Sequence, residues 1–335
     1  MAGARPQDGA CTGRAREVVT AAMRALRFHV FGGPEVLRID ELDAPAPGDG
    51  EVLVEVHAGG LNFADTERRA GTYLADQPLP ETSGFEAAGV VRDGPREWVG
   101  KRVAFVHPRA HAELCVVPIA KLIHLPDQLD FVTGAAFPLQ ALTAWHVLHT
   151  LGRVTEKDTV LIHAAAGGVG QLLVQLAREA GATVIGSVSR AAKFDVVKRR
   201  GAHHVLTRGP EFQQQLRELA PSGVNLLLEG LGADVDALTS LAPLGRWVTF
   251  GTAAGQPAPV TLESLYEKSV TVSAFWLRTE MPAHLREHAT NEVLARLLDG
   301  RLQLETTTVP LEDAARAHRR LEGGLTVGKW VLTLR

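Results

Sequence analysis

The sequence predicts an α/β protein in which a strand-rich domain accompanies a doubly wound, parallel-sheet nucleotide-binding domain. Short apolar stretches separated by Gly, Pro and Asp clusters fill residues 23–125, a pattern typical of antiparallel hairpins. Strands and helices then alternate over residues 159–277, which implies βαβ crossovers and a parallel sheet covered by helices on both faces. A glycine-rich turn joins the first strand of this series to its first helix, as nucleotide-binding folds require.

Length and composition exclude several classes of protein. The chain has 335 residues, enough for two domains of about 150 residues each. A net charge of −3 argues against a general polyanion binder, and no apolar run approaches the roughly 20 residues of a membrane span. Two cysteines, Cys11 and Cys115, cannot form a disulfide scaffold or a four-cysteine zinc lobe. We therefore expect a soluble, cytoplasmic protein with neither membrane nor nucleic-acid partners.

Residues 1–22 are set apart from the fold. They contain arginines but no apolar core of signal-peptide length, and Asp8 and Glu17 interrupt the basic character of a transit segment. We expect a disordered extension, with an early start codon or a transit segment as alternatives, because Met23 begins a good strand.

The first domain is expected to be built from short strands. Its predicted strands cover residues 23–30, 36–42, 51–61, 87–91, 102–106 and 112–118. Residues 133–151 then carry the apolar periodicity of a helix.

The alternating series follows. Its predicted strands are 159–164, 183–189, 203–207, 224–230, 246–251 and 271–277, and its predicted helices are 169–180, 191–200, 210–219 and 234–241. A helix over 283–299, a strand over 306–310, a helix over 312–324 and a strand over 329–334 do not extend the series. We expect them to return to the first domain, which gives domains of 23–140 with 278–335, and of 141–277.

The glycine-rich turn matches a dinucleotide fingerprint. Ala165, Gly167 and Gly170 take the three glycine positions, with Gly168 as an extra glycine. Small residues permit the tight turn and let the backbone approach a pyrophosphate at the helix N-terminus. The complete set of loop candidates for cofactor binding is Ala165, Ala166, Gly167, Gly168, Val169 and Gly170. The alternative is a turn that merely fits the fold.

The end of the second strand predicts which dinucleotide binds. NAD sites place an acid about 20 residues after the loop, whereas this chain has Ser189, Arg190 and Lys193 there. Arg208, after the third strand, adds a cation. Hydroxyls and cations without an acid suit a 2′-phosphate, so we expect NADPH. The alternative for Arg190 and Lys193 is a solvated first helical turn.

Several motifs in order then resemble a known family. They are FGGPEVL (31–37), GEVLVEVHAGGLNFADTERRAGTY (50–73), GFEAAGVV (84–91), LTAWHVL (142–148), VLIHAAAGGVGQLLVQLA (160–177) and GKWVLTL (328–334). The chain resembles the medium-chain dehydrogenase/reductases, on the zinc-free quinone oxidoreductase (zeta-crystallin-like) branch. The resemblance implies a GroES-like catalytic domain, a Rossmann domain, NADPH in the cleft between them, and a homodimer formed through edge strands. Phe250 and Gly251, which end the predicted strand 246–251, join the cofactor-binding candidates.

The resemblance also predicts whether the chain holds a catalytic zinc ion. Zinc alcohol dehydrogenases of the superfamily have a cysteine where this chain has Asn62 and a histidine where it has Phe85. A phenyl ring cannot ligate zinc and a neutral amide replaces thiolate poorly, so we expect no metal site.

Hydride chemistry without metal needs an acceptor that is already activated. Quinones and other α,β-unsaturated carbonyl compounds fit, provided that the protein stabilises the developing oxyanion. Asn62 and Tyr73 are the catalytic candidates, and Asp65 is a third that orients the loop rather than touching substrate. The resemblance places Gln140 and Thr143 nearby as substrate-binding residues. For Asn62 and Asp65 the alternative is an Asx turn, for Tyr73 a surface aromatic, and Glu86 is interpreted as a structural carboxylate.

Two other functions stay open. An enoyl-thioester reductase of the same superfamily would want cations at the cleft mouth, for which Arg68, Arg69 and Arg278 are candidates. A non-catalytic NADPH- or RNA-binding protein is the other alternative. The leading prediction is an NADPH:quinone oxidoreductase-like reductase.

Overall fold

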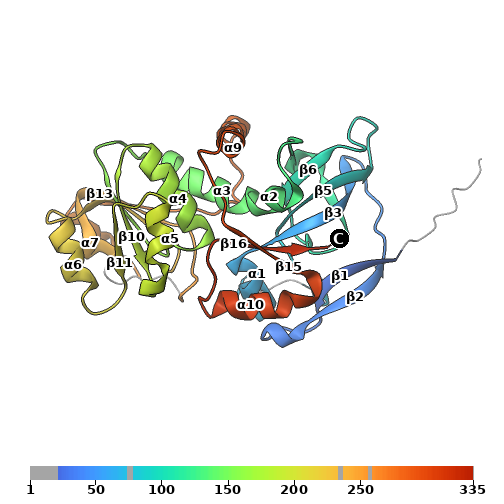
Figure 1. Ribbon diagram of the computed structural model, residues 1–335, viewed down its shortest axis with the longest axis horizontal. Coiled ribbons are helices and arrows are strands. Elements are labelled where there is room, and N and C mark those ends of the chain that lie inside the picture. Colours follow the sequence, from blue (N-terminus) through green and yellow to red (C-terminus); the bar gives the residue numbers. More distant parts are fainter. Residues whose placement is uncertain (1–21, 74–77, 233–236, 256–258, 335) are drawn as a thin grey trace, which may run out of the picture.

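The computed structural model describes residues 22–73, 78–232, 237–255 and 259–334. Apart from Ala22, which opens the first strand, the predicted N-terminal extension lies outside these residues. Two lobes lie side by side along the long axis, one around a parallel sheet and one around the remaining strands (Figure 1). In the described part of the chain, no helix combines the length and apolarity that crossing a membrane requires.

The β-rich lobe contains two sheets in the described residues. In the smaller sheet β1 (Ala22–Phe28) pairs antiparallel with β2 (Leu37–Asp43) and β4 (Glu81–Thr82). The larger sheet has the order β15-β16-β3-β5-β6-β8, and β7 also pairs with β3. Its strands are β3 (Glu51–Leu61), β5 (Glu86–Asp93), β6 (Arg102–Val106), β7 (Leu114–Pro118), β8 (Leu122–His124), β15 (Thr306–Pro310) and β16 (Lys329–Thr333).

The C-terminal strand of the chain lies in this sheet. β16 runs antiparallel to β3, with Trp330 opposite Leu61 and Thr333 opposite Ala58. This register brings the start of β16 beside the end of β3, where α1 (Phe63–Ala70) begins. Helix α10 (Ala314–Glu322), between β15 and β16, contacts α1. The exact domain boundaries, 140/141 and 277/278, stay a prediction.

The parallel sheet has the order β11-β10-β9-β12-β13-β14. This order, 3-2-1-4-5-6 within the domain, is the doubly wound order that binds dinucleotides where it reverses, between β9 and β12. The strands are β9 (Thr159–Ile162), β10 (Thr183–Val188), β11 (His204–Thr207), β12 (Val224–Glu229), β13 (Leu241–Thr249) and β14 (Thr271–Ala274). The fold class is therefore confirmed.

Helices cover both faces of this sheet because successive strand residues point to opposite sides. On β9, Val160 and Ile162 pack in the same cluster as Leu173 of α4, whereas Leu161 packs with Phe212 of α6. The helices here are α4 (Gly168–Glu179), α5 (Phe194–Arg199), α6 (Phe212–Leu219), α7 (Ala237–Ser240) and α8 (Leu262–Tyr266).

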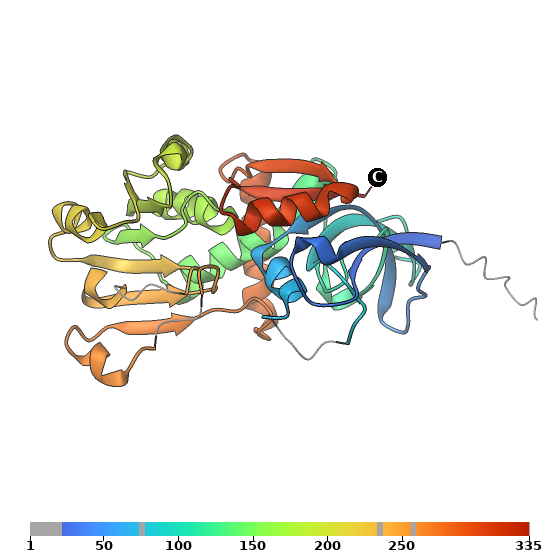
Figure 2. The same ribbon diagram turned by 90° about the horizontal axis from the view of Figure 1, so that it is seen from below.

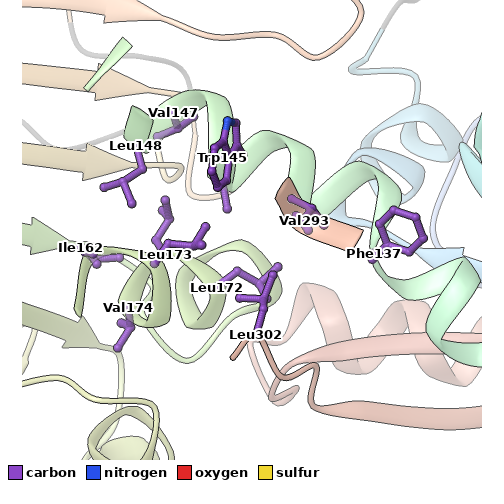
Figure 3. Packing of buried hydrophobic residues seen from close by; sticks show 14 of the residues in the cluster. Phe137, Trp145, Val147, Leu148, Ile162, Leu172, Leu173, Val174, Val293 and Leu302 are labelled. Atoms are coloured by element: carbon purple, nitrogen blue, oxygen red, sulfur yellow. The ribbon is translucent and has the colours of Figure 1, made fainter. Parts of the chain in front are cut away.

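Three helices join the lobes: α2 (Phe131–Ala136), α3 (Pro138–Trp145) and α9 (Ala283–Leu298). Figure 3 shows Trp145 above Leu173 of α4, with Val293 of α9 between Trp145 and Phe137. One apolar cluster therefore extends from the parallel sheet through α3 and α9 into the β-rich lobe. Figure 2 shows the two lobes side by side from below.

Several predicted elements were wrong in extent, and three of them contain or adjoin candidate site residues. The helix over 133–151 is interrupted at Phe137, because Pro138 restarts it as α3, and it continues as a π-helical stretch over His146–Leu151. The predicted strand 271–277 ends at Ala274. The strand predicted over 246–251 begins at Leu241 and ends at Thr249, which leaves Phe250 and Gly251 in the following connection. The predicted helix 234–241 begins outside the described residues.

Candidate active site

The phosphate loop connects β9 to α4. A Cβ at Gly170 would lie 2.3 Å from the Ala164 carbonyl oxygen and 2.8 Å from Ala165 Cα, so only glycine lets α4 approach the loop this closely. Gly167 caps α4, and Ala164 turns the chain with φ +51°. The N–H groups at the start of α4 thus lie at the switch point of the sheet, the place where doubly wound folds bind a pyrophosphate. Ala165 and Ala166 are buried beneath the loop, while Gly168 and Val169 form the first turn of α4.

Cations gather at the ends of β10 and β11. The pKa of Lys193 is lowered by burial and by the charges of Arg190 and Arg208, which places these three predicted residues within electrostatic reach of one another. Lys193 Nζ also donates to the carbonyl oxygens of Gly324 (2.8 Å) and Thr326 (2.9 Å), and one further N–H remains. Ser189 lies exposed beside them. Three like charges in one place fit a 2′-phosphate.

The other side of the switch point holds Phe250 and Gly251. Phe250 N donates to the Glu229 carbonyl oxygen at 2.9 Å, and its ring would lie 2.6 Å from a Cβ at Gly230. Both predicted residues therefore lie at the carboxyl edge of the sheet, next to the end of β12.

Asn62 is the N-cap residue of α1 and is buried, with 4% of its surface exposed. Its amide nitrogen donates to Glu86 Oε1 at 2.7 Å and to the Gly60 carbonyl oxygen at 3.4 Å. Its amide oxygen accepts from Lys329 Nζ at 2.7 Å and from Gln140 Nε2 at 3.3 Å. Both amide hydrogens are thus directed at protein acceptors, which disagrees with the expectation that Asn62 donates to substrate.

Lys329 is a site residue that the sequence analysis missed. Its ammonium is buried, and it donates to both Asn62 and Glu86. Burial lowers the pKa of Lys329, and the Glu86 carboxylate opposes that shift. Glu86 is fully buried, and its second oxygen accepts from Leu139 N at 2.7 Å, in keeping with a structural carboxylate. A lysine at the start of the apolar strand KWVLTL was the available signal.

Asp65 lies in the first turn of α1. Its Oδ2 accepts from Asn62 N at 2.7 Å, which makes it the acidic half of a capping box. Burial raises the pKa of Asp65 to about 7. The contact is the orienting one that the sequence allowed for Asp65, and it lies within α1 rather than toward substrate.

Gln140 and Thr143 lie one turn apart on α3, and both are buried. A Cβ at Gly168 would lie 2.0 Å from Gln140 Oε1, so the Gln140 amide lies directly against the phosphate loop. Since Gln140 also donates to Asn62, it links the phosphate loop to the buried polar core. The structure records no polar partner for the Thr143 side chain among the described residues.

Tyr73 lies in an aromatic group formed by residues of both lobes. Its ring meets Phe85 edge-on at 5.7 Å and Trp276 edge-on at 6.3 Å between centroids. Trp276 Nε1 donates to Tyr73 Oη at 2.6 Å. Trp276, which follows β14, was not singled out from the sequence, because the predicted strand 271–277 placed it inside a sheet.

Two of the three arginines suggested as cations at the entrance of a coenzyme A site are buried. Arg68 is buried against Glu81, and Arg69 is buried against Glu322. Arg278 alone of the three is exposed, with its guanidinium 5.2 Å from the centre of the Trp276 ring.

Comparisons with known proteins identify matching families, relatives and solved structures. Residues 48–127 match the family described as alcohol dehydrogenase GroES-like domain, and residues 168–296 match the family described as zinc-binding dehydrogenase. The chain is 34% identical to a 2-haloacrylate reductase of Burkholderia sp over 91% of this chain and 97% of the relative. It is also 34% identical to a quinone oxidoreductase of Pseudomonas aeruginosa, over 92% and 99% of the two chains. The solved structure of Escherichia coli quinone oxidoreductase with NADPH superposes with a TM-score of 0.87 at 31% identity. The match covers 92% of this chain and 99% of that structure's chain.

The description of the second matching family raises the question of zinc. The Asn62 amide oxygen already accepts from two donors, and Phe85 offers only a phenyl ring. A dication at the remaining carboxylate, Glu86, would lie beside the buried Lys329 ammonium and be repelled by it. These groups do not fit a zinc site. In the ranges that the structure describes, no cluster of three or more His, Cys, Asp or Glu side chains could hold a metal.

Proposed function

The chain belongs to the medium-chain dehydrogenase/reductase superfamily, in its quinone oxidoreductase branch, and on that premise we propose that it reduces quinones and other α,β-unsaturated carbonyl compounds without zinc. It is an NADPH-dependent oxidoreductase of small molecules. The proposal goes further in naming the acceptor and in excluding a metal from the mechanism. The observation that carries it is the buried Lys329–Glu86–Asn62 core, whose hydrogen bonds and buried ammonium do not fit a bound metal ion.

The names of the relatives support the acceptor class. A quinone and a 2-haloacrylate both present a carbon–carbon double bond conjugated to a carbonyl group, so hydride can enter at carbon while charge moves to oxygen. Such acceptors need a proton donor near that oxygen more than they need a Lewis acid.

Different residues of this chain bind the cofactor, donate the proton and anchor the site. When bound, NADPH supplies a hydride. The N-terminus of α4 holds the pyrophosphate, and Ser189, Arg190, Lys193 and Arg208 hold the 2′-phosphate. Tyr73 gives its phenolic proton to the acceptor oxygen and is reprotonated from water. The Lys329–Glu86–Asn62 core keeps the floor of the cleft rigid, and Asn62 acts there as an anchor rather than as a donor.

The enoyl-thioester alternative receives less support from the charges. A coenzyme A substrate carries several phosphates, and two of the three cations suggested for it, Arg68 and Arg69, are buried in ion pairs. We therefore favour compact acceptors.

A two-substrate assay tests this proposal. NADPH oxidation is followed with 9,10-phenanthrenequinone and with a crotonyl thioester, each with and without a chelator. We expect quinone turnover that the chelator does not change. Turnover of the thioester alone would assign an enoyl reductase instead, and NADPH binding without turnover of either would assign a binding protein.

The proposal includes a homodimer in the cytoplasm. Among the described strands, β14 is hydrogen-bonded on one side only, by β13, so its outer edge is available to a second copy. Leu244, Leu262 and Tyr266, from the segments around β14, are large exposed apolar side chains. Light scattering should give twice the chain mass for the wild type, and a Leu262→Glu variant should shift toward the monomer. A monomeric wild type would refute this part.

A further inference from the structure

A row of rings and cations connects the two lobes. Arg278 lies over the Trp276 ring, Trp276 meets Tyr73, Tyr73 meets Phe85, and the Arg68 guanidinium lies 5.6 Å from the centre of the Phe85 ring. Phe85 and Arg68 come from the β-rich lobe, whereas Trp276 and Arg278 follow the last strand of the parallel sheet. Tyr73 therefore lies where the two lobes meet.

A second contact joins the same segments. Thr252 Oγ1, in the connection after β13, donates to Glu67 Oε1 on α1 at 3.0 Å. The segments after β13 and β14 are thus both hydrogen-bonded to the α1 region, which fixes Trp276 relative to Tyr73.

The indole bond constrains the phenol. A phenolic hydroxyl has one hydrogen to donate and lone pairs that accept. The indole N–H can only donate, so at 2.6 Å it must occupy an acceptor position on Tyr73 Oη and leave the hydroxyl hydrogen free. Among the described residues, no protein acceptor is recorded for that hydrogen. The hydroxyl hydrogen therefore remains available to an acceptor other than the indole.

From this geometry we infer that Trp276 is a positioning residue for the reductase, which holds Tyr73 so that its proton is directed at the acceptor. The inference rests on the proposed role of Tyr73 as proton donor. Trp276 does not need to touch the acceptor for this role, although 47% of its surface is exposed.

The charges around Tyr73 agree with a tuned donor. Burial raises the pKa of Tyr73, and the Trp276 bond and the nearby charges of Arg278 and Arg68 act against that rise. Glu67, on α1, raises the pKa of Tyr73 by its negative charge. Loss of the indole donor therefore makes the phenol a weaker acid as well as a less ordered one.

The bond itself can be tested without substrate or cofactor. The chain has five tryptophans, so the protein gives few indole N–H signals in a nitrogen–proton NMR spectrum, and Trp276→Phe identifies one of them. In a Tyr73→Phe variant we expect that one signal to shift and to exchange faster with water, while the other four stay in place. An unmoved Trp276 signal would overturn the inference whatever the substrate of the enzyme is.

The catalytic consequence is tested by kinetics on a quinone. Trp276→Phe keeps an aromatic ring and removes only the N–H, so we expect kcat to fall about tenfold with KM changed little. The decrease should be absent in a Tyr73→Phe background, because there is no hydroxyl to position. Trp98→Phe, in the connection between β5 and β6 and with no recorded contact to Tyr73 among the described residues, is the matched control. An equal decrease in both backgrounds would assign Trp276 a packing role instead.

If the wild type reduces no quinone, the proposed function fails, while the NMR result on Trp276 and Tyr73 still stands or falls by itself.

Discussion

At the scale of single residues, Asp65 couples stability to pH. Its carboxyl has a pKa near 7 in the folded protein, against 3.8 for the free side chain, so the folded state holds the proton more tightly. The stability that this proton confers is complete below about pH 4 and is lost as pH rises through about 7.

We therefore predict that Asp65→Asn removes a decrease in stability between pH 4 and pH 8. The difference in urea midpoint between the variant and the wild type should grow in favour of the variant as pH rises across this range, because asparagine can still accept from Asn62 N without a buried charge. A constant difference at all pH values would contradict the pKa assignment.

Two buried histidines make the stability depend on pH in the opposite direction to Asp65. Burial lowers the pKa of His111 to about 4 and that of His318 to about 3, so the folded state binds protons less readily there than the unfolded state. Their contribution to stability is present above about pH 6.5 and is lost as pH falls through the folded pKa values. Because both histidines remain in Asp65→Asn, the comparison above isolates the carboxyl.

Lys329 and Glu86 are predicted to be strongly coupled. Lys329→Met leaves the Glu86 carboxylate buried without its cation, which should cost about 3–5 kcal/mol of unfolding free energy. The double variant with Glu86→Gln removes that charge and should recover much of the loss. The cycle is measured by denaturant unfolding of the two single variants and the double variant. Additive effects would show that the two groups are not a pair.

The sequence pointed to Asn62, Asp65 and Glu86 but not to the partners of their side chains. The pattern GLNFAD marked Asn62 and Asp65, and GFE marked Glu86, yet nothing in either pattern indicates which group the Asn62 amide faces. That depends on Lys329, 267 positions away, which the pairing of β16 with β3 brings into contact. Long-range side-chain partners of this kind are not encoded in local periodicity.

At the scale of elements, the β9–loop–α4 unit depends on Gly170. We predict that Gly170→Ala lowers NADPH affinity at least tenfold, because its Cβ would overlap the Ala164 carbonyl and push α4 away from the loop. Fluorescence titration with NADPH measures the effect. Gly48→Ala is the control, since its Cβ would meet only the flexible end of Glu51 at 3.2 Å. Equal affinities in the two variants would show that the loop does not hold the cofactor as described.

The ends of β10 and β11 should set the cofactor preference. Arg190→Ala with Arg208→Ala removes two of the three cations, so we expect NADPH affinity to fall by tenfold or more and NADH affinity to change little. The ratio of the two dissociation constants is the relevant quantity. Parallel losses for both cofactors would place these arginines away from the 2′-phosphate.

Most elements could be predicted from sequence because strand and helix periodicities are strong in a doubly wound fold. The errors occurred where one residue changes the local rule. Pro138 divides a continuous apolar pattern into α2 and α3, and β14 ends at Ala274 although Phe275, Trp276 and Leu277 continue its apolar run. Because of the second error, Trp276 was predicted to lie inside a sheet rather than beside Tyr73.

At the scale of the whole molecule, function requires contacts between the lobes. Gln140 joins the phosphate loop to Asn62, the indole of Trp276 joins β14 to Tyr73, and Lys193 joins the end of β10 to the segment before β16. Gly167 and Gly328 also form a parallel bridge between the phosphate loop and that segment. The phosphate loop and Tyr73, the proposed proton donor, are thus positioned by the same set of contacts, which extends from one sheet to the other.

The most direct test of this account is the quinone reductase rate of protein whose bound zinc has been quantified and then removed with a chelator. The account predicts well below one zinc per chain before treatment and the same NADPH-dependent rate after it, because the buried Lys329–Glu86–Asn62 core does not fit a metal ion. One zinc per chain, with activity lost on chelation and restored by added zinc, would contradict it.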